Sequence, residues 1–174
     1  MESEARERLS NDHHAVSELL TQLLTALDNK DVPASYSKLD LLWARLAVHI
    51  RAEHLHLFPT VINHFGAGPD RGKAQAIVEQ LRTDHDFFMR ELARAIGILR
   101  ESGNNESKLA AVNDAVREIE KRLATHNEIE ETQIYRWSSS ILTEPEQLEL
   151  HARINAELEN RPPRFSAETW ANSL

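Results

Sequence analysis

Two halves of the sequence repeat one arrangement of histidine and glutamate, and this repeat constrains the fold more than any other feature. The stretch from His49 to Glu53 aligns without a gap with the stretch from His126 to Glu130. An Asp-His pair precedes each stretch, ending at His13 in the first half and at His85 in the second. The repeat predicts a helical hairpin that occurs twice, with Asp-His on one helix and His-x3-Glu on the next.

Four segments show the 3.6-residue periodicity of amphipathic helices, and they cover about 4–27, 34–64, 70–100 and 106–137. Turn-forming residues separate them. Short connections between long helices make consecutive helices antiparallel, so we predict an all-α, up-down-up-down four-helix bundle. Pro59 is expected to kink the second helix or to tighten its last turn.

The segment after the bundle is predicted to hold one shorter helix. Thr143 is a suitable N-cap for it, and Pro145 fits its first turn. The rest of the tail is expected to be irregular, with Phe165 and Trp170 pinning it to the bundle. We therefore divide the chain into a bundle, 1–140, and a C-terminal helix and tail, 141–174, that packs on the bundle or extends from it.

Composition limits the chemistry. The 174 residues include no cysteine, which excludes disulfides, thiolate-bound zinc, iron–sulfur clusters and cysteine nucleophiles. Any metal must therefore be bound by nitrogen and oxygen. The formal net charge of −8 argues against a nucleic acid or an anionic membrane as partner. Without a signal peptide or a membrane-spanning run, we expect a cytoplasmic protein.

Two histidine–glutamate pairs are expected to face the core. Residues four apart lie one turn above each other on a helix, so His49 and Glu53 point the same way. His126 and Glu130 do the same. Both pairs fall inside the leucine stripe of their helix, where an unpaired polar group is costly.

The Asp-His histidines also lie on apolar stripes, so every helix sends at least one imidazole into the core. Burying four imidazoles and two carboxylates is unfavourable unless something pairs them, and a dinuclear metal site does so. Oxygen and imidazole donors suit iron, then manganese or zinc. We therefore predict six metal ligands: His13, His49, Glu53, His85, His126 and Glu130.

Neighbouring polar residues are expected to play lesser parts. His14 lies about 100° around the helix from His13 and should face solvent. His54 is expected beside the site or in a structural role, and His56 near its mouth. Glu131 is the alternative ligand if Glu130 is not one. A ferritin-like di-iron site is excluded, because it needs Glu-x-x-His on two helices and a core glutamate on each of the others.

These motifs, together with Leu57-Phe58-Pro59 and Ile134-Tyr135, resemble the hemerythrin-like (HHE cation-binding) family over about residues 9–137. The resemblance implies an oxo-bridged di-iron site in which Glu53 and Glu130 bridge the irons and the four histidines are terminal ligands. Oxygen-carrying members have one more histidine on the third helix, where this chain has Met89. An open or water-occupied iron position is therefore implied. Three residues could fill it: His54, His56 or Tyr36.

The functional prediction follows from this site. We expect a non-haem di-iron protein that binds or processes a small oxidant, namely dioxygen, nitric oxide or peroxide. The alternative is an iron storage or sensing protein, whose metal occupancy controls stability or partner binding without catalysis. A purely structural bundle is the third reading, and oligomeric state stays open.

Overall fold

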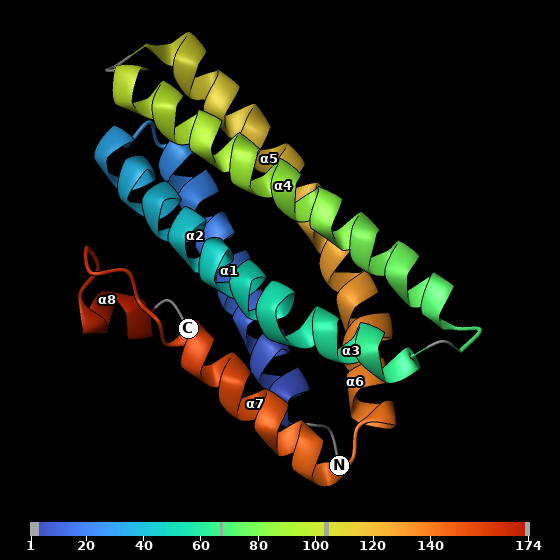
Figure 1. Cartoon of the computed structure of the whole chain (residues 1–174). Coiled ribbons are helices and arrows are strands. Elements are labelled where there is room, and N and C mark those ends of the chain that lie inside the picture. The colour runs from blue at the N-terminus through green and yellow to red at the C-terminus, as the bar shows by residue number, and fades with distance from the viewer. Residues whose placement is uncertain (1–3, 67, 103–104, 173–174) are drawn as a thin grey trace.

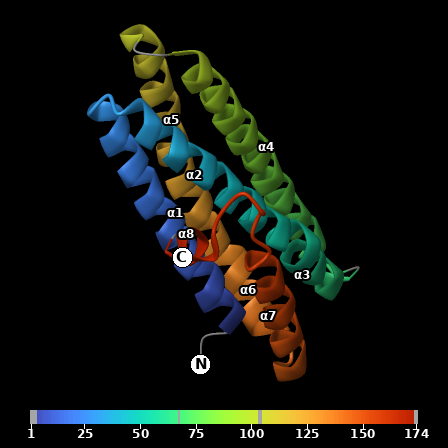
Figure 2. The same cartoon turned by 90° about the vertical axis from the view of Figure 1, so that its left-hand side faces the viewer.

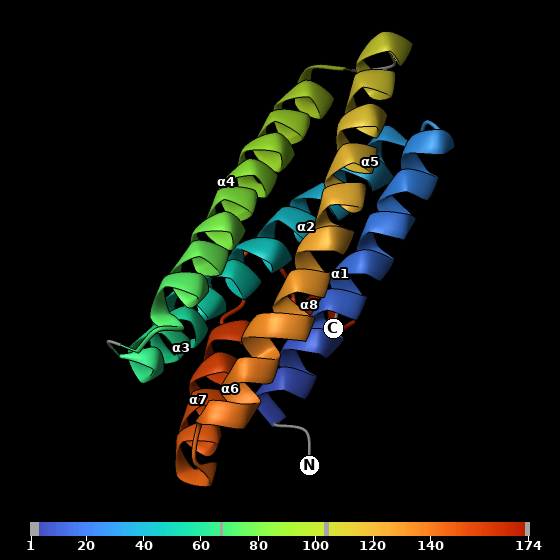
Figure 3. The same cartoon turned by 90° about the vertical axis from the view of Figure 1, so that its right-hand side faces the viewer.

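The computed structural model describes residues 4–66, 68–102 and 105–172. Over these residues the chain is all-helical and contains no strand, which confirms the predicted all-α class. The four longest helices are α1 (Glu4–Asp28), α2 (Val32–Ala52), α4 (Arg71–Ser102) and α5 (Glu106–Ile129). Helices α1 and α4 each pack against both α2 and α5. The chain reverses direction between consecutive long helices (Figures 1 and 3).

Two of the predicted helices are interrupted, which corrects the continuous helices expected at 34–64 and 106–137. A π-helical segment, η1 (Glu53–Leu57), separates α2 from α3 (Phe58–Phe65). A second one, η2 (Glu130–Ile134), separates α5 from α6 (Tyr135–Ile141). Each begins at the glutamate of a His-x3-Glu pair. A π turn holds an extra residue, so it changes which later residues face the core.

Pro59 lies in the first turn of α3, directly after the first π segment. Pro59 has no N–H to donate to the helical turn before it, and the N–H of the preceding Phe58 already reaches back five residues to the carbonyl of Glu53. The irregularity that the sequence assigned to the proline thus lies in the five residues before it. The irregular turn of this helix therefore begins at Glu53, and it does not lie in the last helical turn, which was one of the two alternatives that the sequence predicted.

The apolar core consists of two clusters. One is formed by α1 from Val16 onward together with α2, α4 and α5, and it includes Leu23, Phe88 and Val116. The other lies toward the N-terminus of α1 and includes Leu9, Leu81 and residues of the C-terminal segment. Asp12 and His13 of α1, Asp84 and His85 of α4, and His126 of α5 fall in sequence between the two clusters. The polar site is therefore enclosed by apolar packing on both sides.

The C-terminal segment holds α7 (Glu144–Leu158) and α8 (Ala167–Ala171). The predicted start of α7 is confirmed, since the backbone N–H of Thr143 donates to Glu146 in a capping box (2.8 Å). Helix α7 packs on α1 and α2. Helix α8 lies over the same two helices (Figure 2), where Thr169 lines a cavity with Leu19 of α1 and Leu41 of α2. The tail is less irregular than expected, because part of it forms α8. Trp170 of α8 is buried in the second cluster. No helix in the described ranges is both long and apolar enough to cross a membrane.

Candidate metal centre

The six predicted ligands meet in one buried layer of the bundle. Each of the six residues is at most 5% exposed. The histidines come from the four long helices, one from each, and the glutamates are the first residues of the two π segments. The residues that converge are His13, His49, Glu53, His85, His126 and Glu130.

The imidazoles form two pairs, which we call half-sites. In the first half-site, the Nε2 atoms of His13 and His49 lie 3.2 Å apart. In the second half-site, the Nε2 atoms of His85 and His126 lie 2.9 Å apart. Each pair joins one Asp-His histidine to one His-x3-Glu histidine. The internal repeat of the sequence is thus also a repeat of the site.

Each glutamate lies between the two half-sites, with one carboxylate oxygen near each. The two oxygens of Glu53 lie 3.5 Å from Nε2 of His49 and 3.4 Å from Nε2 of His85. The two oxygens of Glu130 lie 3.1 Å from Nε2 of His13 and 3.0 Å from Nε2 of His126. A carboxylate placed with one oxygen toward each of two imidazole pairs has the position of a bridge between two cations.

The donor set fits a pair of metal ions. One oxygen of Glu53 and one of Glu130 are buried without a hydrogen-bond partner among the described residues, which is costly in an apolar interior. Two imidazole nitrogens that bind the same cation, each at about 2.0–2.1 Å and at right angles to one another, would lie roughly 3 Å apart. The Nε2 atoms of each pair here have this separation. Cations between the pairs would satisfy the carboxylates and the imidazoles together.

The outer nitrogen of His49 is held by a buried aspartate. Nδ1 of His49 donates to Oδ2 of Asp12 (2.9 Å), and the other oxygen of Asp12 accepts from Arg45. Burial by itself raises the pKa of Asp12, but the hydrogen bond and charge of His49 and the charge of Arg45 hold it below its usual value. A carboxylate on Nδ1 fixes the tautomer that leaves Nε2 free to bind a metal.

The second half-site repeats this chain of contacts. Nδ1 of His126 lies 3.3 Å from Oδ2 of Asp84, and Nε of Arg122 donates to Oδ1 of the same aspartate (2.8 Å). Arg45 and Arg122 each stand four residues before their histidine, in Arg-Leu-Ala-Val-His and Arg-Leu-Ala-Thr-His. Sequence reasoning missed both arginines, although extending the internal repeat by one turn would have found them.

The outer nitrogens of the two Asp-His histidines have different partners. Nδ1 of His13 lies 3.0 Å from a carboxylate oxygen of Glu131, and Nδ1 of His85 lies 2.9 Å from Nε2 of His54. Glu131 and His54 occupy equivalent positions of the repeat, each directly after the π-segment glutamate. The expectation that His54 lies beside the site agrees with this contact. Glu131 touches a candidate ligand and is itself outside the buried cluster.

Tyr135, which the sequence analysis named only as part of the family motif, is a further residue of the site. Its hydroxyl donates to Glu53 (2.8 Å) and lies 3.0 Å from Nε2 of His13. Phe58, its equivalent in the repeat, stacks on the ring of His85. Burial, with the charges of Glu130 and Glu53, raises the pKa of Tyr135 well above its usual value. The phenol therefore keeps its proton.

Several histidines are charged more readily than usual when no cation is bound. Burial opposes the charge on His13, His49 and His126, yet neighbouring carboxylates raise the pKa of all three, and that of His49 the most clearly. Burial also opposes the charge on Glu130, but His126 holds the pKa of this carboxyl well below its usual range. Cations must therefore displace protons from these imidazoles.

The three residues proposed to fill the open position do not all reach the site. Tyr36 lies elsewhere, where its hydroxyl accepts from Arg100, so this prediction is wrong. Nε2 of His56 lies 3.9 Å from a carboxylate oxygen of Glu157 of α7. Met89, which stands at the position of the family's extra histidine, packs against the first apolar cluster. Helical spacing could not place His56, because it lies within the first π segment.

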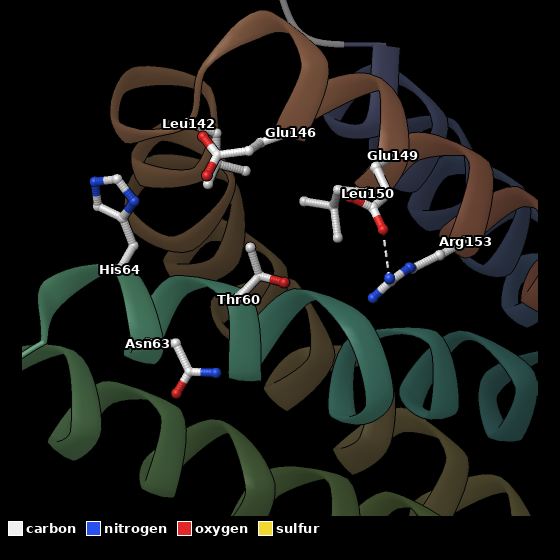
Figure 4. A pocket seen from close by; sticks show the side chains of 8 residues that line it. All are labelled: Thr60, Asn63, His64, Leu142, Glu146, Glu149, Leu150 and Arg153. Atoms are coloured by element: carbon white, nitrogen blue, oxygen red, sulfur yellow. Dashed lines mark hydrogen bonds and ion pairs between the residues drawn. The ribbon is translucent and has the colours of Figure 1, made fainter.

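A small cavity of about 10 Å³ adjoins the four imidazoles and Glu130, about the room of one water molecule. Its other walls are Val16, Leu46, Leu123 and Asn127. A larger cavity of about 520 Å³ lies away from this centre, between α3 and α7 (Figure 4). Its described lining contains no group of three metal-binding side chains, so size alone does not mark the site.

Long helices with a buried histidine–glutamate cluster define a helical protein whose core can hold metal cations. The model of the family described as hemerythrin HHE cation binding domain matches residues 4–138, and the chain belongs to this family. The predicted family is thereby confirmed. No curated protein and no solved structure gave a match.

Proposed function

We propose that residues 1–140 form an up-down-up-down four-helix bundle that holds a non-haem di-iron centre on the six buried histidines and glutamates. One observation supports this above all: Glu53 and Glu130 each turn one oxygen to each imidazole pair. Donors of nitrogen and oxygen without sulfur suit iron, with manganese or zinc as lesser candidates.

We propose further that the centre binds or processes a small oxidant: dioxygen, nitric oxide or peroxide. When bound, the irons would supply a redox-active pair able to bind such a molecule and exchange electrons with it. The residues of the chain would orient this small molecule and limit its size. The cavity of about 10 Å³ beside the imidazoles limits the ligand to a few atoms, and Val16, Leu46 and Leu123 form its apolar walls. Tyr135 holds a proton at the edge of the site.

The test is metal analysis with an absorption spectrum of the wild type and of the matched variants His49→Ala and His126→Ala. The wild type should bind two irons per chain, and each variant should lose one half-site. Reaction with peroxide or nitric oxide should then change the spectrum of the loaded wild type. A protein that binds no iron would defeat the proposal.

Closure of the site favours a second function, iron storage or sensing without catalysis. The candidate ligands are almost wholly buried, and metal binding to a buried cluster stabilises the fold that forms it. This function predicts a large rise in Tm on iron loading and no reaction with peroxide or nitric oxide. The same samples therefore decide between the two.

A further inference from the structure

The C-terminal segment reaches the first half-site through one buried arginine. The family match ends at residue 138, so α7 and α8 lie outside it. Trp170 of α8 covers the guanidinium of Arg45, whose Cζ lies 4.7 Å from the centre of the indole ring, well inside the range of a cation–π contact. Arg45 binds Asp12, and Asp12 binds His49. The tail and a candidate ligand are thus joined by three consecutive contacts.

Arg45 needs this cover. The residue is 1% exposed, and its Nε and Nη1 atoms have no hydrogen-bond partner among the described residues. A buried guanidinium that binds one carboxylate through one nitrogen is poorly compensated. The face of Trp170 supplies an attraction that does not require those nitrogens. Without it, Arg45 would gain by turning toward water and away from Asp12.

The indole ring is itself held in place. Nε1 of Trp170 donates to the backbone carbonyl of Leu158 at the end of α7 (3.3 Å). Arg164, in the connection between α7 and α8, binds both oxygens of Asp40 on α2, each at 3.0 Å. The tail is therefore docked on the helix that also carries Arg45 and His49.

We propose that Trp170 is a positioning residue of the metal centre: by covering Arg45 it keeps Asp12, and through it His49, in the orientation that binds a cation. The inference rests on the proposed di-iron centre. The C-terminal segment does not cover the second half-site in this way, because Arg122 stacks on Phe87 of α4 (4.2 Å) and stays partly exposed. The C-terminal segment thus acts on one ion of the two.

The test compares Trp170→Ala with the matched variant Phe87→Ala. Cobalt(II) is titrated into each metal-free protein, and the affinity of each ion is read from absorption against a competing chelator. Trp170→Ala should weaken one of the two ions by about tenfold or more, as loss of an outer partner does, and Trp170→Phe should restore most of it. Arg45→Met should have the same effect as Trp170→Ala, and the two should not add.

A second measurement needs no metal. The Nδ1–H proton of His49, assigned by its loss in His49→Gln, should shift in the NMR spectrum of Trp170→Ala and stay in that of Phe87→Ala. The inference is overturned if this signal does not move, or if Trp170→Ala lowers Tm while both ions bind as in the wild type. Failure of the wild type to bind any metal would instead defeat the proposed function, and the NMR result still decides whether Trp170 positions His49.

Discussion

The two half-sites are built from the same repeat and covered differently. Arg45 of the first half-site is 1% exposed and lies beneath Trp170. The side chain of Arg122 in the second is 37% exposed, and a cavity of about 290 Å³ opens beside it. Identical arginine–aspartate–histidine chains are therefore buried in one half and partly solvated in the other. Breaking a buried ion pair is far more costly than breaking an exposed one.

The half-sites also differ in what surrounds the imidazoles. Glu131 and Tyr135 place a carboxylate and a hydroxyl on the first half-site. Their repeat equivalents, His54 and Phe58, place an imidazole and an apolar ring on the second. Two cations held by the same two kinds of donor, imidazole and carboxylate, would consequently meet unequal environments. The repeat determines the donors, and the departures from it determine the inequality.

The largest expected effect removes what the half-sites share. Glu130→Ala deletes a carboxylate that faces both imidazole pairs, so both ions should be lost or weakened by more than about 100-fold. Glu131→Ala is the matched control, since Glu131 contacts the candidate ligand His13 of the first half-site. It should weaken only the first ion, by about tenfold. Metal content after dialysis measures both, and a stronger effect of Glu131→Ala would exchange the roles of the two residues.

The next effect separates the half-sites. Asp12→Asn leaves Arg45 buried without an anion and should destabilise the metal-free protein by about 3–5 kcal/mol. Asp84→Asn leaves Arg122 without its anion as well, but Arg122 already contacts solvent. This variant should therefore lower the free energy of unfolding by about 1 kcal/mol or less. Urea unfolding of both variants gives the comparison. Equal losses would mean that the difference in burial has no energetic weight.

A smaller effect concerns the hydroxyl that only the first half-site has. Tyr135→Phe leaves an oxygen of Glu53 without its donor and should cost about 1–3 kcal/mol in the metal-free protein. Phe58→Tyr adds a hydroxyl at the equivalent place, against His85. The double variant moves the group from one half-site to the other. Thermal unfolding with and without iron measures each, and a neutral Tyr135→Phe would show that the contact is dispensable.

The smallest expected effect is on pH dependence. A histidine with a raised pKa adds stability that is complete below the unfolded value of about 6.5 and is lost as pH rises through the folded value. The raised pKa values of His13, His49 and His126 predict that metal-free protein loses stability as the pH rises above about 6.5. His54 acts oppositely, because burial and His85 lower its pKa.

The iron-loaded protein should behave in the opposite way over the same range, since deprotonated imidazoles bind cations better. Tm against pH for both forms measures this, and NMR titration of the ring protons assigns it. If the pKa of His54 were raised as well, the two half-sites would be electrostatically alike and the comparison would fail.

Much of this protein could be predicted from its sequence, for a physical reason. Apolar residues at a 3.6 period identify helices and their buried face, and polar residues on that face stand out against it. His13, Glu53 and Glu130 were chosen in this way, and the structure buries all three. The tail was harder, because the short helix around Trp170 is defined by packing and not by periodicity.

The π segments lay beyond sequence reasoning. A single extra residue in a turn leaves the hydrophobic pattern almost unchanged, yet it decides which residue after the glutamate reaches the site. Placing His54, Glu131 and Tyr135 depended on that shift. The prediction of Tyr36 as a site residue was wrong for a related reason, because proximity across helices depends on their axial register.

The sequence by itself determined the family, the helical class and the repeated set of donors, because local periodicity and spacing specify them. Tertiary structure alone decided that the two copies differ. Arg-Leu-Ala-Val-His and Arg-Leu-Ala-Thr-His are nearly the same peptide, and neither contains the information that α8 covers one of them. That contact joins residues 45 and 170, and a contact across such a separation is set by the packing of the whole chain.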